Sequence, residues 1–88
     1  MKLARVTGTV TATAKDARLG GLVLLLCDLI DGAGAVIEPG CVAVDTAGAG
    51  HGDTVLIAYG SAARLPARSS NAPVDAAIVA IVDRVTIG

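Results

Sequence analysis

A glycine-rich cluster near the middle of the chain, Gly48-Ala49-Gly50-His51-Gly52, is the pattern that most invites a chemical role. In dinucleotide sites such glycines let the backbone approach a pyrophosphate held at the N-terminus of the next helix. Here the following residues, 54–57, read Thr-Val-Leu-Ile, a short and largely β-branched run that favours a strand. No Lys-Ser or Lys-Thr pair follows, so the cluster is not a P-loop. We therefore expect a turn between two strands and no cofactor, with the glycines supplying positive φ and a close backbone approach.

His51 is the only histidine, and the nearby Asp53 would be its natural partner in acid–base catalysis. No nucleophile or third partner with a recognisable context accompanies them. Ser61 lies in a Gly-Ser-Ala-Ala segment and not in a nucleophile elbow. We interpret His51 as a solvated loop side chain, which on the rim of a pore would tune the charge with pH. No catalytic site is predicted.

The remaining candidate groups are cysteines and isolated charges. Cys27 and Cys41 lie inside apolar runs without metal-ligand spacing, so we expect two buried, reduced core residues and no metal site. The charges beside apolar segments show neither metal nor acid–base spacing. We expect them to make charge-assisted hydrogen bonds to backbone groups or to Arg64, within or between subunits. These charges are Asp45, Arg64, Asp75 and Asp83.

The composition points to a small protein that associates with itself. Its 88 residues predict one domain, and 53% of them are hydrophobic although Phe and Trp are absent and Tyr59 is the only aromatic residue. A monomer of this size has too little interior for so many aliphatic side chains, so some of them should face another subunit. A compact monomer with many alanines on its surface is the alternative.

Charge and apolar runs narrow the class of protein further. The net charge is −1, from 7 basic and 8 acidic residues, with no basic run and no row of aromatics to stack bases. This pattern argues against nucleic-acid binding. The longest apolar runs, 22–27 and 76–82, are far shorter than the ~20 residues of a membrane-spanning helix, and no secretory pattern is visible. We expect a cytosolic protein.

Hydrophobic periodicity predicts an all-β fold. Residues 2–13 alternate between small or apolar side chains and Arg or Thr, as in a half-buried strand, with Gly8 marking a bend. Residues 22–30 are apolar on both faces, which we interpret as barrel interior on one side and a neighbouring subunit on the other. The other expected elements are strands at 41–46, 54–59 and 77–87, turns at 31–34 and 39–40, and a short helical turn at 60–64 capped by Ser61.

Five strands with short connections indicate a closed or nearly closed antiparallel barrel, for which the five-stranded OB-like Greek-key barrel is the nearest small architecture. Closure removes the exposed sheet edges that would be a hazard in so aliphatic a chain. A barrel of this kind could also be a small ligand- or oligonucleotide-binding module, and that function remains an alternative.

Segments in a characteristic order cover nearly the whole chain: residues 1–10, 43–45 with 48–50, 52–56, 60–64 and 73–83. The Gly-Ser-Ala-Ala-Arg and Pro-Val-Asp-Ala elements are the most specific of them. In this order and spacing they resemble the EutN/CcmL-type pentameric vertex proteins of bacterial microcompartments and carboxysomes. The resemblance covers residues 1–88 as a single domain.

The resemblance implies a structural protein without catalysis. Five OB-like barrels would form a homopentamer that caps the five-fold vertices of a polyhedral shell in the bacterial cytoplasm and leaves a narrow central pore. The partners would be further copies of the chain and hexameric and pseudohexameric shell proteins. Local pattern does not encode ring size, so a hexameric ring stays open as well. The implied pore turn comprises Gly48, Ala49, Gly50 and His51, and the implied subunit interface Ser61, Arg64 and Asp75.

Overall fold

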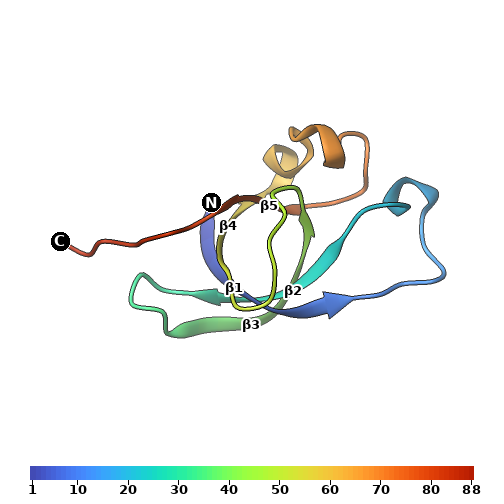
Figure 1. The fold of residues 1–88 in the computed structure, drawn as a ribbon. Coiled ribbons are helices and arrows are strands. Elements are labelled where there is room, and N and C mark those ends of the chain that lie inside the picture. Colours follow the sequence, from blue (N-terminus) through green and yellow to red (C-terminus); the bar gives the residue numbers. More distant parts are fainter.

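Five strands form one closed barrel around a small aliphatic core in the computed structural model, which describes residues 1–88 (Figure 1). The strands follow one another around the barrel in the order β1-β2-β3-β5-β4, and β4 closes onto β1. The all-β, five-stranded OB-like barrel expected from the sequence is thus confirmed. The elements are β1 (Lys2–Val10), η1 (Ala17–Leu19), β2 (Leu24–Ile30), β3 (Val36–Asp45), β4 (Thr54–Tyr59), η2 (Gly60–Arg64), η3 (Ala67–Ser69) and β5 (Ala76–Ile81), where η marks a 3-10 turn.

The barrel is mixed, so the expectation of a purely antiparallel sheet was wrong. Strands β3 and β5 run parallel and pair only at Val44↔Ala77 and Asp45↔Ile78. The other four strand pairs are antiparallel. The reason is geometric, because a closed ring with an odd number of strands cannot alternate direction at every step. One neighbouring pair must run parallel.

The core is built from small and branched aliphatic side chains. The period-two pattern of β1 is confirmed, since Ala4 and Val6 are buried while Thr7 and Thr9 are exposed. The pairing of β1 with β2 shifts register beside Gly8, where an irregularity was expected. The central cluster contains Ala4, Val6, Leu25, Cys27, Leu29, Ala43, Val55, Ile57, Ala76 and Ile78.

The Pro39-Gly40 pair does not form the turn that the sequence suggested. Strand β3 continues through it. Cys41 opposes Cys27 and Glu38 opposes Leu29, so β3 carries one extra residue at this point. Gly40 adopts φ +82°, and its N–H donates to the Asp28 carboxylate at 3.3 Å. A bulge held by the neighbouring strand therefore replaces the turn, because β2 offers an acceptor there.

The last strand is shorter than the predicted 77–87. Pairing of β5 with β4 reaches Val55↔Ile81, and the final backbone bond runs from Val82 N–H to the Thr54 carbonyl at 2.7 Å. Strand β4 begins at Thr54, so residues beyond 82 have no strand beside them. The 3-10 turn at 60–64 is present as expected, but Ser61 does not cap it: Tyr59 occupies the cap position without a side-chain bond.

Much of the aliphatic surface stays uncovered in a single molecule. Along β2, Leu25 and Cys27 are buried, whereas Leu24 and Leu26 remain partly accessible on the other face. The accessible surface is 5137 Å², against about 4,700 Å² expected of a globular monomer of 8.6 kDa. The large apolar side chains that remain exposed are Met1, Val23, Val36, Ile37, Val42, Leu65, Ile81, Val85 and Ile87.

The outline of the molecule is elongated, with principal extents of 43 × 23 × 20 Å. The β2–β3 hairpin and the C-terminal segment project from one end, and the loop that carries η1 projects from the other (Figure 1). No helical segment has the length and apolar character needed to cross a membrane.

The two cysteines lie opposite each other on β2 and β3, and both are free thiols. Cys27 is 0% exposed, as predicted, whereas Cys41 is only partly buried. Burial, assisted by the neighbouring Cys41, Asp28 and Asp45, raises the pKa of the Cys27 thiol from 9.0 to about 11.

This shift predicts a loss of stability in alkaline solution. The unfolded chain releases the Cys27 proton near pH 9 and the folded chain near pH 11, so the contribution is complete below pH 9 and is lost as the pH rises to about 11. The free energy of unfolding should fall by roughly 2 kcal/mol across that window. Urea titrations at a series of pH values measure the fall, and Cys27→Ala should flatten it between pH 9 and 10. An unchanged slope in that variant would contradict the assignment.

Candidate functional site

The glycine-rich cluster lies in the loop between β3 and β4, and a buried carboxylate fixes its first half. Asp45, the last residue of β3, is 7% exposed. Its Oδ1 accepts from the N–H groups of Ala47 (3.0 Å) and Gly48 (3.1 Å), and its Oδ2 accepts from Ala49 N–H (3.0 Å). These charge-assisted bonds confirm the expectation that the Asp45 carboxylate binds backbone groups.

A second carboxylate fixes the end of the same loop. Asp53 Oδ2 accepts from Gly50 N–H at 2.8 Å, and Asp53 N–H donates to the Gly50 carbonyl at 3.0 Å. The loop then rests on β1, because Gly52 N–H donates to the Val6 carbonyl (2.9 Å) and Val6 N–H to the Asp53 carbonyl (3.0 Å). The other flank is tied to β5 by Thr46, whose Oγ1 donates to the Ile78 carbonyl at 2.6 Å. The turn is therefore held by three strands.

The outward side of the turn is bare. Gly48 and Gly52 adopt φ of +79° and +88°. Any other residue at either position would adopt this backbone conformation only with strain. A Cβ at Gly48 would meet no atom of the chain, and one at Gly50 would meet only Asp53 Oδ2, at 3.9 Å. His51 is exposed. The glycines consequently leave the backbone open to close approach by another molecule.

The turn carries no catalytic arrangement. The Asp53 carboxylate binds the backbone, and no hydrogen bond joins it to His51. The element after the cluster is strand β4, as predicted, so no helix N-terminus is available for a pyrophosphate. No group of three or more potential metal ligands occurs in the chain.

The three residues that the resemblance assigned to a subunit interface lie around η2 and the approach to β5. Arg64 Nη1 donates to the Val74 carbonyl at 3.0 Å, and Gly60 N–H donates to the Asp75 carbonyl at 2.9 Å, so the two segments are bonded together. Ser61 and Asp75 are exposed. The Asp75 carboxylate has no hydrogen-bond or ion-pair partner in the chain, and neither does Asp83, so Arg64 does not pair with either of them as it might have done within one subunit.

Tyr59, at the end of β4, shares a small polar cluster with Lys2 and Cys41. Its hydroxyl lies 3.5 Å from Cys41 Sγ, and Lys2 Nζ lies 5.4 Å from the ring centre, a cation–π contact. Burial, followed by the contact with Cys41 and the charges of Glu38 and Asp75, raises the pKa of the Tyr59 hydroxyl. The phenol therefore stays protonated at neutral pH and is not an activated nucleophile or base.

An apolar groove was not found by sequence reasoning. Its volume is about 240 Å³, below the roughly 300–1,000 Å³ of small-molecule pockets. Asp75 is the only charged residue along it. No local sequence pattern could predict the groove, because three segments that are far apart in the chain form it. Its lining residues are Leu19, Leu24, Val42, Ala43, Val44, Pro73, Val74, Asp75 and Ala76.

Removing the Asp45 carboxylate should destabilise the barrel. Asp45→Ala leaves the N–H groups of residues 47, 48 and 49 without their acceptor. The free energy of unfolding should therefore fall by about 1–3 kcal/mol. Urea unfolding measures this fall. Asp31→Ala is a matched control, because the Asp31 carboxylate also accepts two backbone N–H bonds but in an exposed turn. Equal losses in both variants would contradict a special role for Asp45.

Comparison with known proteins identifies the family of this chain. The profile of the family described as "Ethanolamine utilisation protein EutN/carboxysome" matches residues 1–83. The carboxysome shell vertex protein CcmL of Thermosynechococcus vestitus is 44% identical over 86 residues, covering 98% of this chain and 87% of the relative. The structure of Gloeobacter violaceus CcmL superimposes with a TM-score of 0.92 at 42% identity, covering 99% of this chain and 90% of the other.

A third relative is similar over its whole length. The GrpN pentameric microcompartment shell protein from Rhodospirillum rubrum has a TM-score of 0.89 at 38% identity, covering 100% of this chain and 99% of that one. The family suggested by the ordered sequence segments is confirmed. The chain belongs to the EutN/CcmL family of microcompartment shell vertex proteins, which are structural proteins and not enzymes.

Proposed function

We propose that this shell vertex protein acts as a homopentamer. In this proposal one ring caps each five-fold corner of a microcompartment, where sheets of hexameric and pseudohexameric shell proteins meet. The observation that carries the proposal is the 0.89 TM-score to a pentameric shell protein over the full length of both chains. A flat layer of six-fold tiles cannot close into a polyhedron, so five-fold units are needed at its corners.

The uncovered aliphatic surface supports assembly with other copies. Nine large apolar side chains are exposed in one molecule, and only 18 of its 88 residues are buried. Burial of apolar surface contributes about 25 cal/mol of favourable free energy for each Å², so contacts between copies would be favourable. Charge is nearly balanced at −1, and like-charge repulsion between subunits would be weak.

The glycine turn is the segment that we place nearest the five-fold axis. Five chains converge most closely there, and a backbone without Cβ atoms at Gly48 and Gly50 permits that approach. Asp45 and Asp53 hold the turn rigid without help from another subunit. The exposed His51 would then lie at the opening of the pore. Ser61, Arg64 and Asp75 remain the proposed boundary between neighbouring subunits.

The structure does not support the alternative function of an OB-like module that binds oligonucleotides. Tyr59 is the only aromatic side chain, and it is occupied by Lys2 and Cys41, so no platform for stacking bases exists. The two arginines that border a second, polar hollow already bond to Asp16 and to a backbone carbonyl.

The homopentamer predicts a defined mass in solution. Native mass spectrometry at micromolar concentration should give a species of five times the 8.6 kDa subunit mass. A clean monomer at that concentration would contradict the proposal, and six subunits would replace the pentamer with a hexamer.

The placement of the turn at the axis predicts different effects for two glycine substitutions. Gly50 does not have a positive φ, and a side chain there has room within its own chain. Gly50→Val should therefore leave the midpoint of thermal unfolding nearly unchanged and abolish the ring. Gly48→Val should abolish the ring and also destabilise the barrel by about 1–3 kcal/mol, because of the positive φ. Ala14→Val, in the exposed loop after β1, serves as the control. A native ring formed by Gly50→Val would show that the turn lies elsewhere.

A further inference from the structure

Two thiols face each other across strands β2 and β3, and neither takes part in the glycine turn or in the proposed subunit boundary. We propose that Cys27 and Cys41 form a reversible disulfide within one subunit when a low-molecular-weight disulfide, such as oxidised glutathione, acts as the oxidant. The chain has no other cysteine, so this is the one disulfide that a single chain can form. The proposal concerns the inside of each barrel and holds whether or not subunits assemble into a ring.

The register of β2 and β3 places the two side chains on the same face of the sheet. Cys27 and Cys41 are directly opposite each other in an antiparallel pair. Residues in that position have Cα atoms about 4.5 or 5.5 Å apart, depending on the hydrogen-bond pattern. Disulfides span Cα separations of about 4.4–6.8 Å. Both kinds of pair fall within that range, so the bond can form without a change of register.

Both thiols pack on the same part of the core. Cys27 belongs to the central cluster and is fully buried, and Cys41 packs against this cluster while remaining partly buried. Cys41 is also one of the groups that raise the pKa of the Cys27 thiol, as expected of two sulfur atoms that lie near each other. The chain therefore holds the two reacting atoms in one place before any oxidant arrives.

The different exposure of the two thiols decides which one reacts first. An oxidant in solution can reach Cys41 but not Cys27, which is 0% exposed. The Tyr59 hydroxyl lies 3.5 Å from Cys41 Sγ and stays protonated, so it can donate a hydrogen bond to this sulfur once the thiol has lost its proton. Cys41 is therefore the attacking group, and Cys27 closes the bond.

Thiol–disulfide exchange forms the bond in two steps. Cys41 loses its thiol proton to solvent, and its sulfur attacks one sulfur of the oxidant, which forms a mixed disulfide and releases one thiolate. Cys27 then loses its proton and attacks the Cys41 sulfur, which forms the bond between the two cysteines and releases the second thiolate. The two released thiolates take up the two protons. Overall, two cysteine thiols become one disulfide, and the oxidant becomes two thiols.

The bond would be reversible. The Cβ atoms of opposite residues lie about 4.5–5.5 Å apart, whereas those of most disulfides are about 3.5–4.5 Å apart, so the strands must approach each other slightly. Disulfides that need such an adjustment are reduced more easily than structural ones. In a reducing cytosol the pair would remain as two thiols, and a more oxidising environment would close it.

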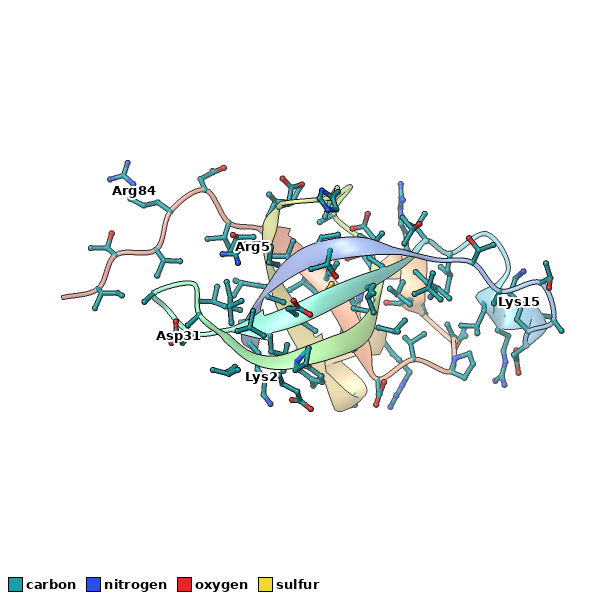
Figure 2. The ribbon with its side chains drawn as sticks, turned by 90° about the horizontal axis from the view of Figure 1, so that it is seen from below. Lys2, Arg5, Lys15, Asp31 and Arg84 are labelled. Atoms are coloured by element: carbon teal, nitrogen blue, oxygen red, sulfur yellow. The ribbon has the colours of Figure 1, made fainter.

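The bond would fasten the base of the β2–β3 hairpin. It closes a loop that contains residues 28–40, with the bulge at Pro39-Gly40 and the hairpin tip. Figure 2 shows Asp31 of this tip at the end of the molecule opposite Lys15. The cysteines form the last regular pair before the bulge, so the bond lies where strand pairing becomes irregular. The stability of each subunit would thus depend on the thiol–disulfide balance of its surroundings.

Oxidation of the wild-type protein in native buffer tests the pairing. After incubation with millimolar oxidised glutathione and blocking of the remaining thiols, the denatured chain should be about 2 Da lighter by mass spectrometry, because two hydrogens are lost. Cleavage of the denatured chain before Asp31 separates Cys27 from Cys41, so the two fragments should stay joined until dithiothreitol is added. Two unreacted thiols, a lasting glutathione adduct or chains linked to one another would each overturn the proposal.

Single substitutions test the order of the two steps. Cys27→Ala should stop at a stable glutathione adduct on Cys41, because no second thiol is present to displace it. Cys41→Ser should leave Cys27 unmodified, because this thiol is buried. Cys27→Val is a second variant of the first kind, should Cys27→Ala impair folding as judged by circular dichroism. A glutathione adduct on Cys27 in folded Cys41→Ser would overturn the assignment of Cys41 as the attacking group.

Thermal unfolding shows whether the native barrel accepts the bond. Closing a loop of about 15 residues should raise the midpoint of unfolding by roughly 10 °C relative to the reduced protein, and dithiothreitol should reverse the rise. Cys41→Ser treated with the same oxidant is the matched control and should keep its midpoint. A lower midpoint in the oxidised wild type would show that the bond forms only in a distorted barrel, against the register on which the proposal rests.

Discussion

The interior of a five-stranded barrel sets the main constraint on this protein. Ten small or branched side chains fill the central cluster, and no aromatic ring is among them. A chain that is 53% hydrophobic has far more aliphatic groups than this interior can accept. The excess therefore lies on the outside, along the second face of β2, on the hairpin tip and beyond β5. In the proposed homopentamer, contacts between subunits would cover part of this aliphatic surface.

Side-chain carboxylates stabilise the loops, as side-chain packing stabilises the strands. Asp45 and Asp53 satisfy the backbone of the glycine turn, Asp31 does so for the hairpin tip, and Asp28 holds the bulge at Gly40. A turn organised by its own chain is already shaped before it meets another molecule, so little conformational entropy is lost on contact. This is an economical way for a chain of 88 residues to present rigid contact elements.

The local parts of the fold could be predicted from the sequence, and the long-range parts could not. Strand 54–59 and the short helical turn at 60–64 follow from residue types alone and occur where they were expected. The bulge at Pro39-Gly40 depends on Asp28 of another strand, so a turn was predicted in its place. The apolar groove joins segments about 20 to 30 residues apart in the chain and carries no local signature. The parallel pair was derivable, because five strands cannot alternate around a circle.

That parallel pair makes the barrel unevenly strong. Strands β3 and β5 share two residue pairs, and the seam between them is supplemented by Thr46, whose N–H and Oγ1 both reach the Ile78 carbonyl. Every other seam has at least four pairs, so thermal opening of an isolated subunit should begin at this one. The amide protons nearest the junction would exchange first. A neighbouring subunit in contact with both strands would keep them paired. The barrel of an assembled subunit would then open less readily than that of an isolated one.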